Sequence, residues 1–398
     1  MKVCGLLMLG LVLFALPALP IALEEGKFIH DGQQVFLKGA MYWQPTAYHQ
    51  WFWDGMDLEK LESDLDQMKG AGMNLVILGA QWGEFVESVD QSARTWTPKA
   101  DNVAKFLKAL ELVREKRMFA MLWFSISKTP EGIDAKWHDP APDKSGYVQP
   151  GFAGFLWHDY PACAQFGEYQ YQAFLEFHTF VASLTRPFDN MLFDPLDWQH
   201  LSINYWDFAQ PKNLAAWREW LQGQNPDLAY WNERWGEANA SWEEVLFPVD
   251  SWVQNTIGRH PAEPYIGLPE QDYTGPKWQD FRSWHNPLYN QIQQGIIEAL
   301  RKGAPEAPIG QRYDMWHFGD FRQATWAPEG VDFLCFGYYP YEASELGSDA
   351  TLERDLGRTL ERLPRPLPMI CWEVGAEIAR LMPEADLAGW RKAQATQV

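Results

Sequence analysis

The sequence has 398 residues, of which 46% are hydrophobic and 22% are charged. These values are typical of folded globular proteins and exclude wholesale disorder. Acidic residues outnumber basic ones by 53 to 33, and a formal charge of −20 makes nucleic acid an unfavourable partner. Tryptophan is unusually frequent, with 22 residues, and indole rings are flat surfaces on which cyclic ligands such as sugars can stack.

The N-terminal segment reads MKVCGLLMLGLVLFALPALPIAL, with Lys2 as its only charge. Its short apolar run and the small residues near its end predict a secretory signal peptide over residues 1–22, cleaved after Ala22. A single membrane anchor is the alternative interpretation. We therefore expect a secreted or periplasmic protein that has no membrane contact beyond this segment.

Cysteine and histidine spacings do not indicate a metal site. The cysteines after the signal peptide are Cys163, Cys335 and Cys371, an odd and scattered set without disulfide-framework or metal-ligand spacing. Cys335 and Cys371 lie in apolar runs, which predicts core positions. The histidines form no HxxxH or HExxH pattern. We expect neither a metal nor a cofactor.

Apolar, strand-like runs alternate with segments of helical periodicity along the chain. The predicted strands are 35–43, 74–80, 118–126, one within 190–206, 307–313, 332–339 and 367–375. The predicted helices are 58–68, one capped by Asp101, 166–184, 212–222 and 278–302.

This alternation predicts a parallel sheet covered by helices, and seven successive units favour an α/β fold of the (β/α)8 TIM-barrel type. No glycine-rich phosphate loop follows the first strand, which argues against a dinucleotide fold. The residues after Glu373 contain no eighth apolar strand, so the barrel is expected to lack it or to be truncated there. The domain organisation we expect is a barrel over 23–398 with an aromatic-rich insertion around 224–275.

A barrel places its site at the carboxyl ends of its strands. Glu373 ends the last predicted strand, where partial burial would raise the pKa of its carboxyl and suit it to catalysis. A helix-capping or ion-paired glutamate is the alternative. The other aromatic and acidic residues at predicted strand ends are Tyr42, Trp43, Trp82, Glu84, Trp123, Tyr338, Tyr339 and Trp372.

Several segments resemble a known group of enzymes. PLPMICWEVG, KGAMYWQP and GMNLVILGAQWGEFVE resemble the seventh, first and second strands of retaining (β/α)8 glycoside hydrolases. WREWLQGQNPDLAYWNERWGEANASWEEVLFP resembles the segment after strand four in family 42 β-galactosidases. The resemblance covers about residues 30–395, although the zinc-binding cysteine cluster usual in that family has no counterpart.

The resemblance implies that Glu373 is the nucleophile and that an Asn-Glu pair at the end of strand four supplies the acid/base. Here the sequence departs from the pattern, because Asn204 is followed by Tyr205. Asp207 lies closer to the expected position, three residues after Asn204. Glu233 is part of the expected Asn-Glu dipeptide, but it lies one helix later in the chain than the family pattern requires. It would fit the pattern only if its own segment formed strand four. The third alternative is that neither residue acts as the acid/base.

The resemblance further implies that Tyr338 or Tyr339 orients the nucleophile. Trp43, Trp82, Trp372 and Asn204 are candidate sugar contacts, and core packing is the alternative for each tryptophan. We expect a secreted glycosidase that cleaves β-linked oligo- or polysaccharides, with β-galactosides favoured by the resemblance, through a retaining double displacement. The alternative is a carbohydrate-binding barrel with impaired catalysis. The sequence does not indicate an oligomeric state.

Overall fold

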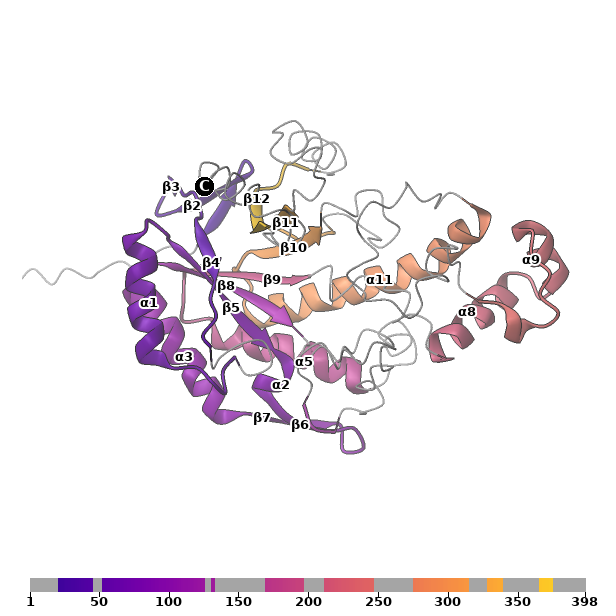
Figure 1. The fold of residues 1–398 in the computed structure, drawn as a ribbon, viewed down its shortest axis with the longest axis horizontal. Coiled ribbons are helices and arrows are strands. Elements are labelled where there is room, and N and C mark those ends of the chain that lie inside the picture. Colours follow the sequence, from indigo (N-terminus) through magenta and orange to yellow (C-terminus); the bar gives the residue numbers. More distant parts are fainter. Residues whose placement is uncertain are drawn as a thin grey trace, which may run out of the picture.

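The structure, a computed structural model, describes residues 21–45, 52–125, 130–132, 169–196, 211–246, 275–314, 328–338 and 365–374. A curled sheet of seven parallel strands forms its centre (Figure 1). In spatial order these are β12 (Met369–Val374), β11 (Phe333–Tyr338), β10 (Ile309–Asp314), β9 (Met191–Leu196), β8 (Phe119–Ser125), β5 (Leu75–Gln81) and β4 (Gly39–Met41).

Each strand pairs with the next one along the chain, which is the arrangement of a (β/α)8 barrel. The predicted fold class is confirmed, and every strand of this parallel sheet overlaps a predicted strand. Among the described residues the sheet has no eighth strand, so β4 and β12 form its edges.

Alternate residues of the central strands serve two different cores. In β5, Val76 and Leu78 join the large cluster between sheet and helices, whereas Leu75 and Ile77 join an inner cluster with Met121 of β8. Because both faces of β5 are buried, its sequence is a continuous apolar run, as in other parallel sheets.

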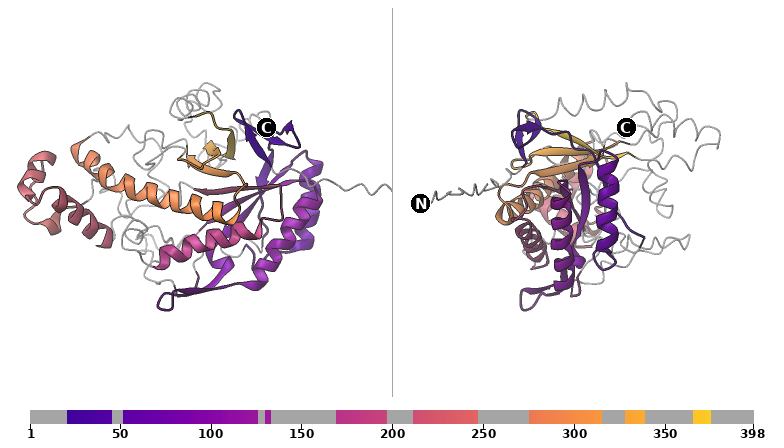
Figure 2. Two further views of the ribbon diagram at one scale, coloured as in Figure 1. Left: turned by 180° about the vertical axis from the view of Figure 1, so that it is seen from behind. Right: turned by 90° about the vertical axis from the view of Figure 1, so that its left-hand side faces the viewer.

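Four helices cover the outer face of the sheet (Figures 1 and 2). They are α1 (Leu58–Gly70), α3 (Ala100–Glu115), α5 (Tyr169–Leu184) and α11 (Pro276–Gly303). The short helix α2 (Trp82–Phe85) follows β5 directly and leads into a hairpin of β6 (Val86–Asp90) and β7 (Thr95–Pro98).

The N-termini of two of these helices show which residues cap them. The predicted helix over 58–68 is confirmed as α1, and the Asp57 side chain caps it by accepting from the N–H groups of Glu59 and Lys60. The predicted cap at Asp101 is wrong, because α3 has its N-cap at Lys99 and Asp101 lies in the first turn. A carboxylate there still interacts favourably with the helix dipole.

A small antiparallel sheet closes the amino-terminal end of the parallel strands. It consists of β1 (Ala22–Glu24), β2 (Lys27–His30) and β3 (Gln33–Gln34). Phe28 packs edge-on against Phe333 with ring centroids 5.6 Å apart, and Ile21 belongs to the same inner cluster. Ile21 is only 2% exposed, so cleavage after Ala22, which stays a prediction, would remove a buried side chain.

A tryptophan-rich lobe lies at the end of the molecule distant from α1 (Figures 1 and 2). It contains α8 (Pro211–Gln224), α9 (Leu228–Trp235), the short helix η4 (Trp242–Glu244) and the start of α11. Trp217 is fully buried at its centre and stacks on both Trp220 and Trp235, with centroids 5.5 and 6.3 Å apart. Part of the tryptophan surplus therefore builds a separate hydrophobic core in this lobe.

The two cysteines in the described residues lie on strands β11 and β12. Cys335 is buried as predicted, whereas the core position predicted for Cys371 is wrong, since it is exposed and alternates with the inward-packed Ile370 on edge strand β12. No helix in the described part of the chain is both long and apolar enough to cross a bilayer.

Candidate functional site

The carboxyl-terminal half of the sheet carries an inward-facing row of polar and aromatic residues. Trp123 of β8 belongs to the inner cluster, and it lies in register with Gly79 of β5 on one side and Asp194 of β9 on the other. Trp43, two residues beyond β4, continues the row. This row forms the floor of the region in which a barrel assembles its site.

Aromatic rings line this row from the β4 side. The Trp43 ring is half-buried and makes edge contacts with Phe52 and Trp123, at centroid distances of 5.6 and 6.0 Å. Phe52 packs over Gly79, where a Cβ atom would lie 3.6 Å from its ring. We refer to Trp43, Phe52 and Trp123 as the aromatic wall.

Asp194 is a carboxylate that the sequence-based prediction missed. It is fully buried on β9, opposite Trp123. Burial of a carboxylate costs several kcal/mol unless other groups compensate for the lost water, so such residues usually have a functional or structural partner. An acidic residue within the apolar run MLFDPL was the available signal.

Glu373, the predicted nucleophile, is the last residue but one of β12. The register between β11 and β12 shifts between Phe336 and Gly337, and this shift places the backbone of Glu373 opposite Gly337. Tyr338 ends β11 opposite Val374. The side chains of Tyr338, Trp372 and Glu373 lie outside the described part of the structure, so their predicted roles stay predictions.

The structure describes one of the two candidates for the acid/base, Glu233. Glu233 is exposed on helix α9, and the fourth strand is β9, so the alternative in which the Glu233 segment forms strand four is wrong. This segment is helical because Asp227 caps its start and Gly236, at φ 69°, ends it. Asn204, Asp207 and Tyr339 lie outside the described residues.

Trp82 belongs to the hydrophobic core. Of the two roles considered for it, core packing is therefore correct. Its side chain is fully buried between β5 and α5, 5.4 Å from the Phe174 ring and 6.4 Å from the Phe177 ring. Phe174 and Phe177 lie far from Trp82 in the chain, so sequence patterns alone did not reveal this packing.

Glu84, also fully buried, lies in the same short helix, α2. Its Oε2 atom accepts hydrogen bonds from the backbone N–H groups of Trp53 and Asp54, at 2.6 and 2.9 Å. Trp53 donates from Nε1 to the carbonyl oxygen of Gly79 at 2.8 Å. The loop after β4 is therefore attached to the carboxyl end of β5.

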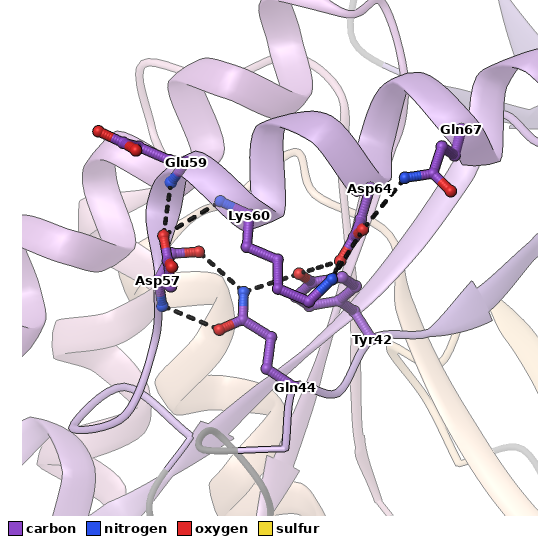
Figure 3. Close-up of polar contacts among 7 residues, drawn as sticks. All are labelled: Tyr42, Gln44, Asp57, Glu59, Lys60, Asp64 and Gln67. Carbon is purple, nitrogen blue, oxygen red and sulfur yellow. Dashed lines mark hydrogen bonds and ion pairs between the residues drawn. The ribbon is translucent and has the colours of Figure 1, made fainter.

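A polar network connects β4 to α1 on the outer side of the wall (Figure 3). Buried Gln44 donates from Nε2 to the Tyr42 hydroxyl at 2.7 Å and accepts from the Asp57 backbone N–H at 2.9 Å. Burial raises the pKa of the Tyr42 hydroxyl, and the hydrogen bond from Lys60 lowers the pKa of Asp64. These groups orient the backbone beside Trp43.

No group of three or more histidine, cysteine, aspartate or glutamate side chains within the described ranges has the arrangement of a metal site.

Comparisons with solved structures show related barrels. The exo-β-1,4-mannosidase Op5Man5 from Opitutaceae bacterium strain TAV5 has a TM-score of 0.50 and 14% identity, covering 93% of this chain and 51% of that protein. The β-amylase catalytic domain from Paenibacillus polymyxa has a TM-score of 0.48 and 12% identity, covering 91% and 98%. The β-galactosidase from Rahnella sp. R3 has a TM-score of 0.49 and 15% identity, covering 90% and 46%.

This chain spans about half the length of the mannosidase that it matches. The predicted resemblance to TIM-barrel glycoside hydrolases is confirmed at the level of the fold. No protein-family model matches the sequence, and no curated protein matches it significantly.

Proposed function

We propose that this protein is a secreted glycoside hydrolase that cleaves β-linked oligo- or polysaccharides with retention of configuration. The observation that carries the proposal is the position of Glu373 near the end of the seventh parallel strand, in a barrel like that of the mannosidase. Trp43, the half-buried member of the aromatic wall, supports a sugar ligand, because an indole face can stack on a pyranose ring. Phe52 and Trp123 are buried beside it. β-Galactosides are the favoured substrates, on the basis of the sequence resemblance.

In the proposed reaction Glu373 attacks the anomeric carbon and displaces the leaving oxygen, to which an acid donates a proton. Water then attacks the anomeric carbon of the glycosyl-enzyme and breaks its bond to the Glu373 carboxylate, and the conjugate base of the acid accepts a proton from that water. Asp207, in the chain after β9, is the preferred acid. Glu233 is the weaker candidate, since α9 lies at the end of the molecule distant from β12 (Figure 1).

The test of this proposal is turnover of nitrophenyl β-galactoside, β-glucoside and β-mannoside by the wild type and by Glu373→Gln. We expect the substitution to lower kcat at least about 10³-fold, because it removes the nucleophile. Glu329→Gln, which changes an exposed carboxylate, is the matched control. Equal activity of Glu373→Gln and the control would refute the assignment, and an inverted product anomer would refute retention.

Rescue of the variants by azide distinguishes the two candidates for the acid. Asp207→Asn should slow turnover by about 10²–10⁴-fold on substrates with poor leaving groups, which need the general acid. Azide should restore part of the rate on activated nitrophenyl glycosides, because it attacks the glycosyl-enzyme in place of water and needs no general base. Glu233→Gln should behave like wild type. The reverse result would assign the acid to Glu233.

A carbohydrate-binding barrel with impaired catalysis is the second candidate. The helical, exposed position of Glu233 favours it, because this leaves Asp207 as the one remaining candidate for the acid. Sugar-induced changes in tryptophan fluorescence without turnover, in wild type and Glu373→Gln alike, would support it.

A further inference from the structure

The loop after β4 is held by a buried carboxylate. Glu84 is fully buried, yet its Oε2 atom accepts two backbone N–H groups, from Trp53 and Asp54. Hydrogen bonds to a charged acceptor are stronger than neutral ones, and they compensate for the loss of water around the carboxylate. Glu84 therefore fixes the backbone of this loop at one point.

This point of attachment sets the position of the aromatic wall. Phe52 directly precedes Trp53, and its ring lies over Gly79 and against the edge of Trp43. Trp43 in turn contacts Trp123 at 6.0 Å. Displacement of the Trp53 backbone would move Phe52 and remove the support on one side of Trp43.

We infer that Glu84 is a positioning residue for sugar binding, which acts by holding Phe52 against Trp43 rather than by touching the substrate. The inference rests on the proposed function and adds to it a residue that orients the sugar-facing wall. It predicts an effect on substrate affinity and not on the chemical step.

The loop has additional anchors that should keep a Glu84 variant folded. Asn102 donates to Asp54 Oδ1 at 2.9 Å, and Lys99 forms an ion pair with the same carboxylate at 2.6 Å. Lys105 donates to the carbonyl oxygens of Trp53 and Asp54. The loss of Glu84 should therefore loosen the loop locally.

The experiment compares Glu84→Ala, Glu84→Gln and the control Glu87→Ala, which truncates an exposed glutamate three residues away. KM and kcat are measured with nitrophenyl β-galactoside, and hydrogen exchange is measured at the amides of Trp53 and Asp54. If wild type binds this glycoside without turnover, Kd from tryptophan fluorescence replaces KM.

For Glu84→Ala we expect KM to rise about tenfold, kcat to stay within about twofold, and both amides to exchange at least about tenfold faster. Glu84→Gln should restore most of the wild-type KM, because its carbonyl oxygen can accept the same two hydrogen bonds. Exchange in β8 should be unchanged, which would show that the variant is folded.

The inference is overturned if Glu84→Ala has the KM of Glu87→Ala, or if kcat falls while KM does not change. Faster amide exchange without a change in KM would also overturn it, since the loop would then be held for stability alone. A wild type that neither binds nor cleaves any β-glycoside would instead overturn the proposed function together with this inference.

Discussion

The Tyr42 hydroxyl donates a hydrogen bond of 2.8 Å to Oδ2 of Asp64, which joins the first strand of the parallel sheet to its first helix. Gln44 donates to the same hydroxyl, and Lys60 pairs with Asp64 (Figure 3). The network thus fixes α1 relative to the backbone that carries Trp43.

We predict that Tyr42→Phe lowers the free energy of unfolding by about 1–3 kcal/mol, because it leaves the buried Nε2 group of Gln44 with one acceptor fewer. Urea denaturation measures the change. Tyr230→Phe, at a tyrosine that is 43% exposed, is the control and should be nearly neutral. Equal stabilities of the two variants would contradict the prediction.

A second prediction concerns acid stability. His178 is 1% exposed on α5, and burial lowers its pKa to about 4 although its ring lies 2.8 Å from the carbonyl oxygen of Phe174. An unfolded histidine titrates near pH 6.5, so between about pH 6.5 and 4 the unfolded state binds a proton that the folded state does not. Stability should therefore fall as the pH falls through this window, by about 3 kcal/mol.

His178→Phe should remove this part of the pH dependence, as measured by denaturation at pH 7, 5.5 and 4.5. Phe177→Leu, a core substitution without a titratable group, should lower stability at every pH and keep the wild-type slope. An unchanged slope in His178→Phe would show that other groups cause the acid sensitivity.

A third prediction distinguishes two tryptophans with different roles. Trp82→Ala should cost about 3–5 kcal/mol of stability, because the indole is fully buried, and should leave KM close to wild type in the folded fraction. Trp43→Ala should raise KM about tenfold with a smaller loss of stability. Calorimetry and glycoside kinetics on the same samples measure both quantities. If Trp82→Ala raised KM and Trp43→Ala did not, the two roles would be reversed.

A fourth prediction tests the packing inside the sheet. A Cβ atom at Gly310 would lie 2.6 Å from the ring of Phe333 on the neighbouring strand, so Gly310→Ala should cost about 1–3 kcal/mol. Gly223→Ala in α8 is the matched control, since no atom lies within 4 Å of its added Cβ, and it should stabilise by about 0.5–1 kcal/mol. Phe333→Leu should relieve the clash in a double-mutant cycle, and additive effects would argue against it.

The parallel strands could be predicted because their burial on both faces leaves long apolar runs in the sequence. The first strand was predicted over 35–43, but only Gly39–Met41 pairs with β5, since the N–H of Val35 bonds to Phe28 of the small antiparallel sheet. The strands of the small antiparallel sheet, β1 to β3, were not predicted, because they have too few residues to show a periodic pattern. Helix α9 was missed although both of its capping residues, Asp227 and Gly236, are evident in the sequence.

Site residues were harder to predict than strands because a residue at a strand end can face either the barrel interior or the helices. Trp43 and Trp82 look alike in the sequence, yet the first joins the aromatic wall and the second packs against α5. The role of Glu84 depends on a loop thirty or so residues earlier, so no local motif indicates it.

The small antiparallel sheet has a consequence for biosynthesis. Phe28 is synthesised about 300 residues before Phe333, against which its ring packs. Contacts between such distant segments carry a high loop-closure cost, and they slow folding. The base of the barrel therefore stays open until β11 has been synthesised, and during that interval its apolar interior would depend on chaperones for protection.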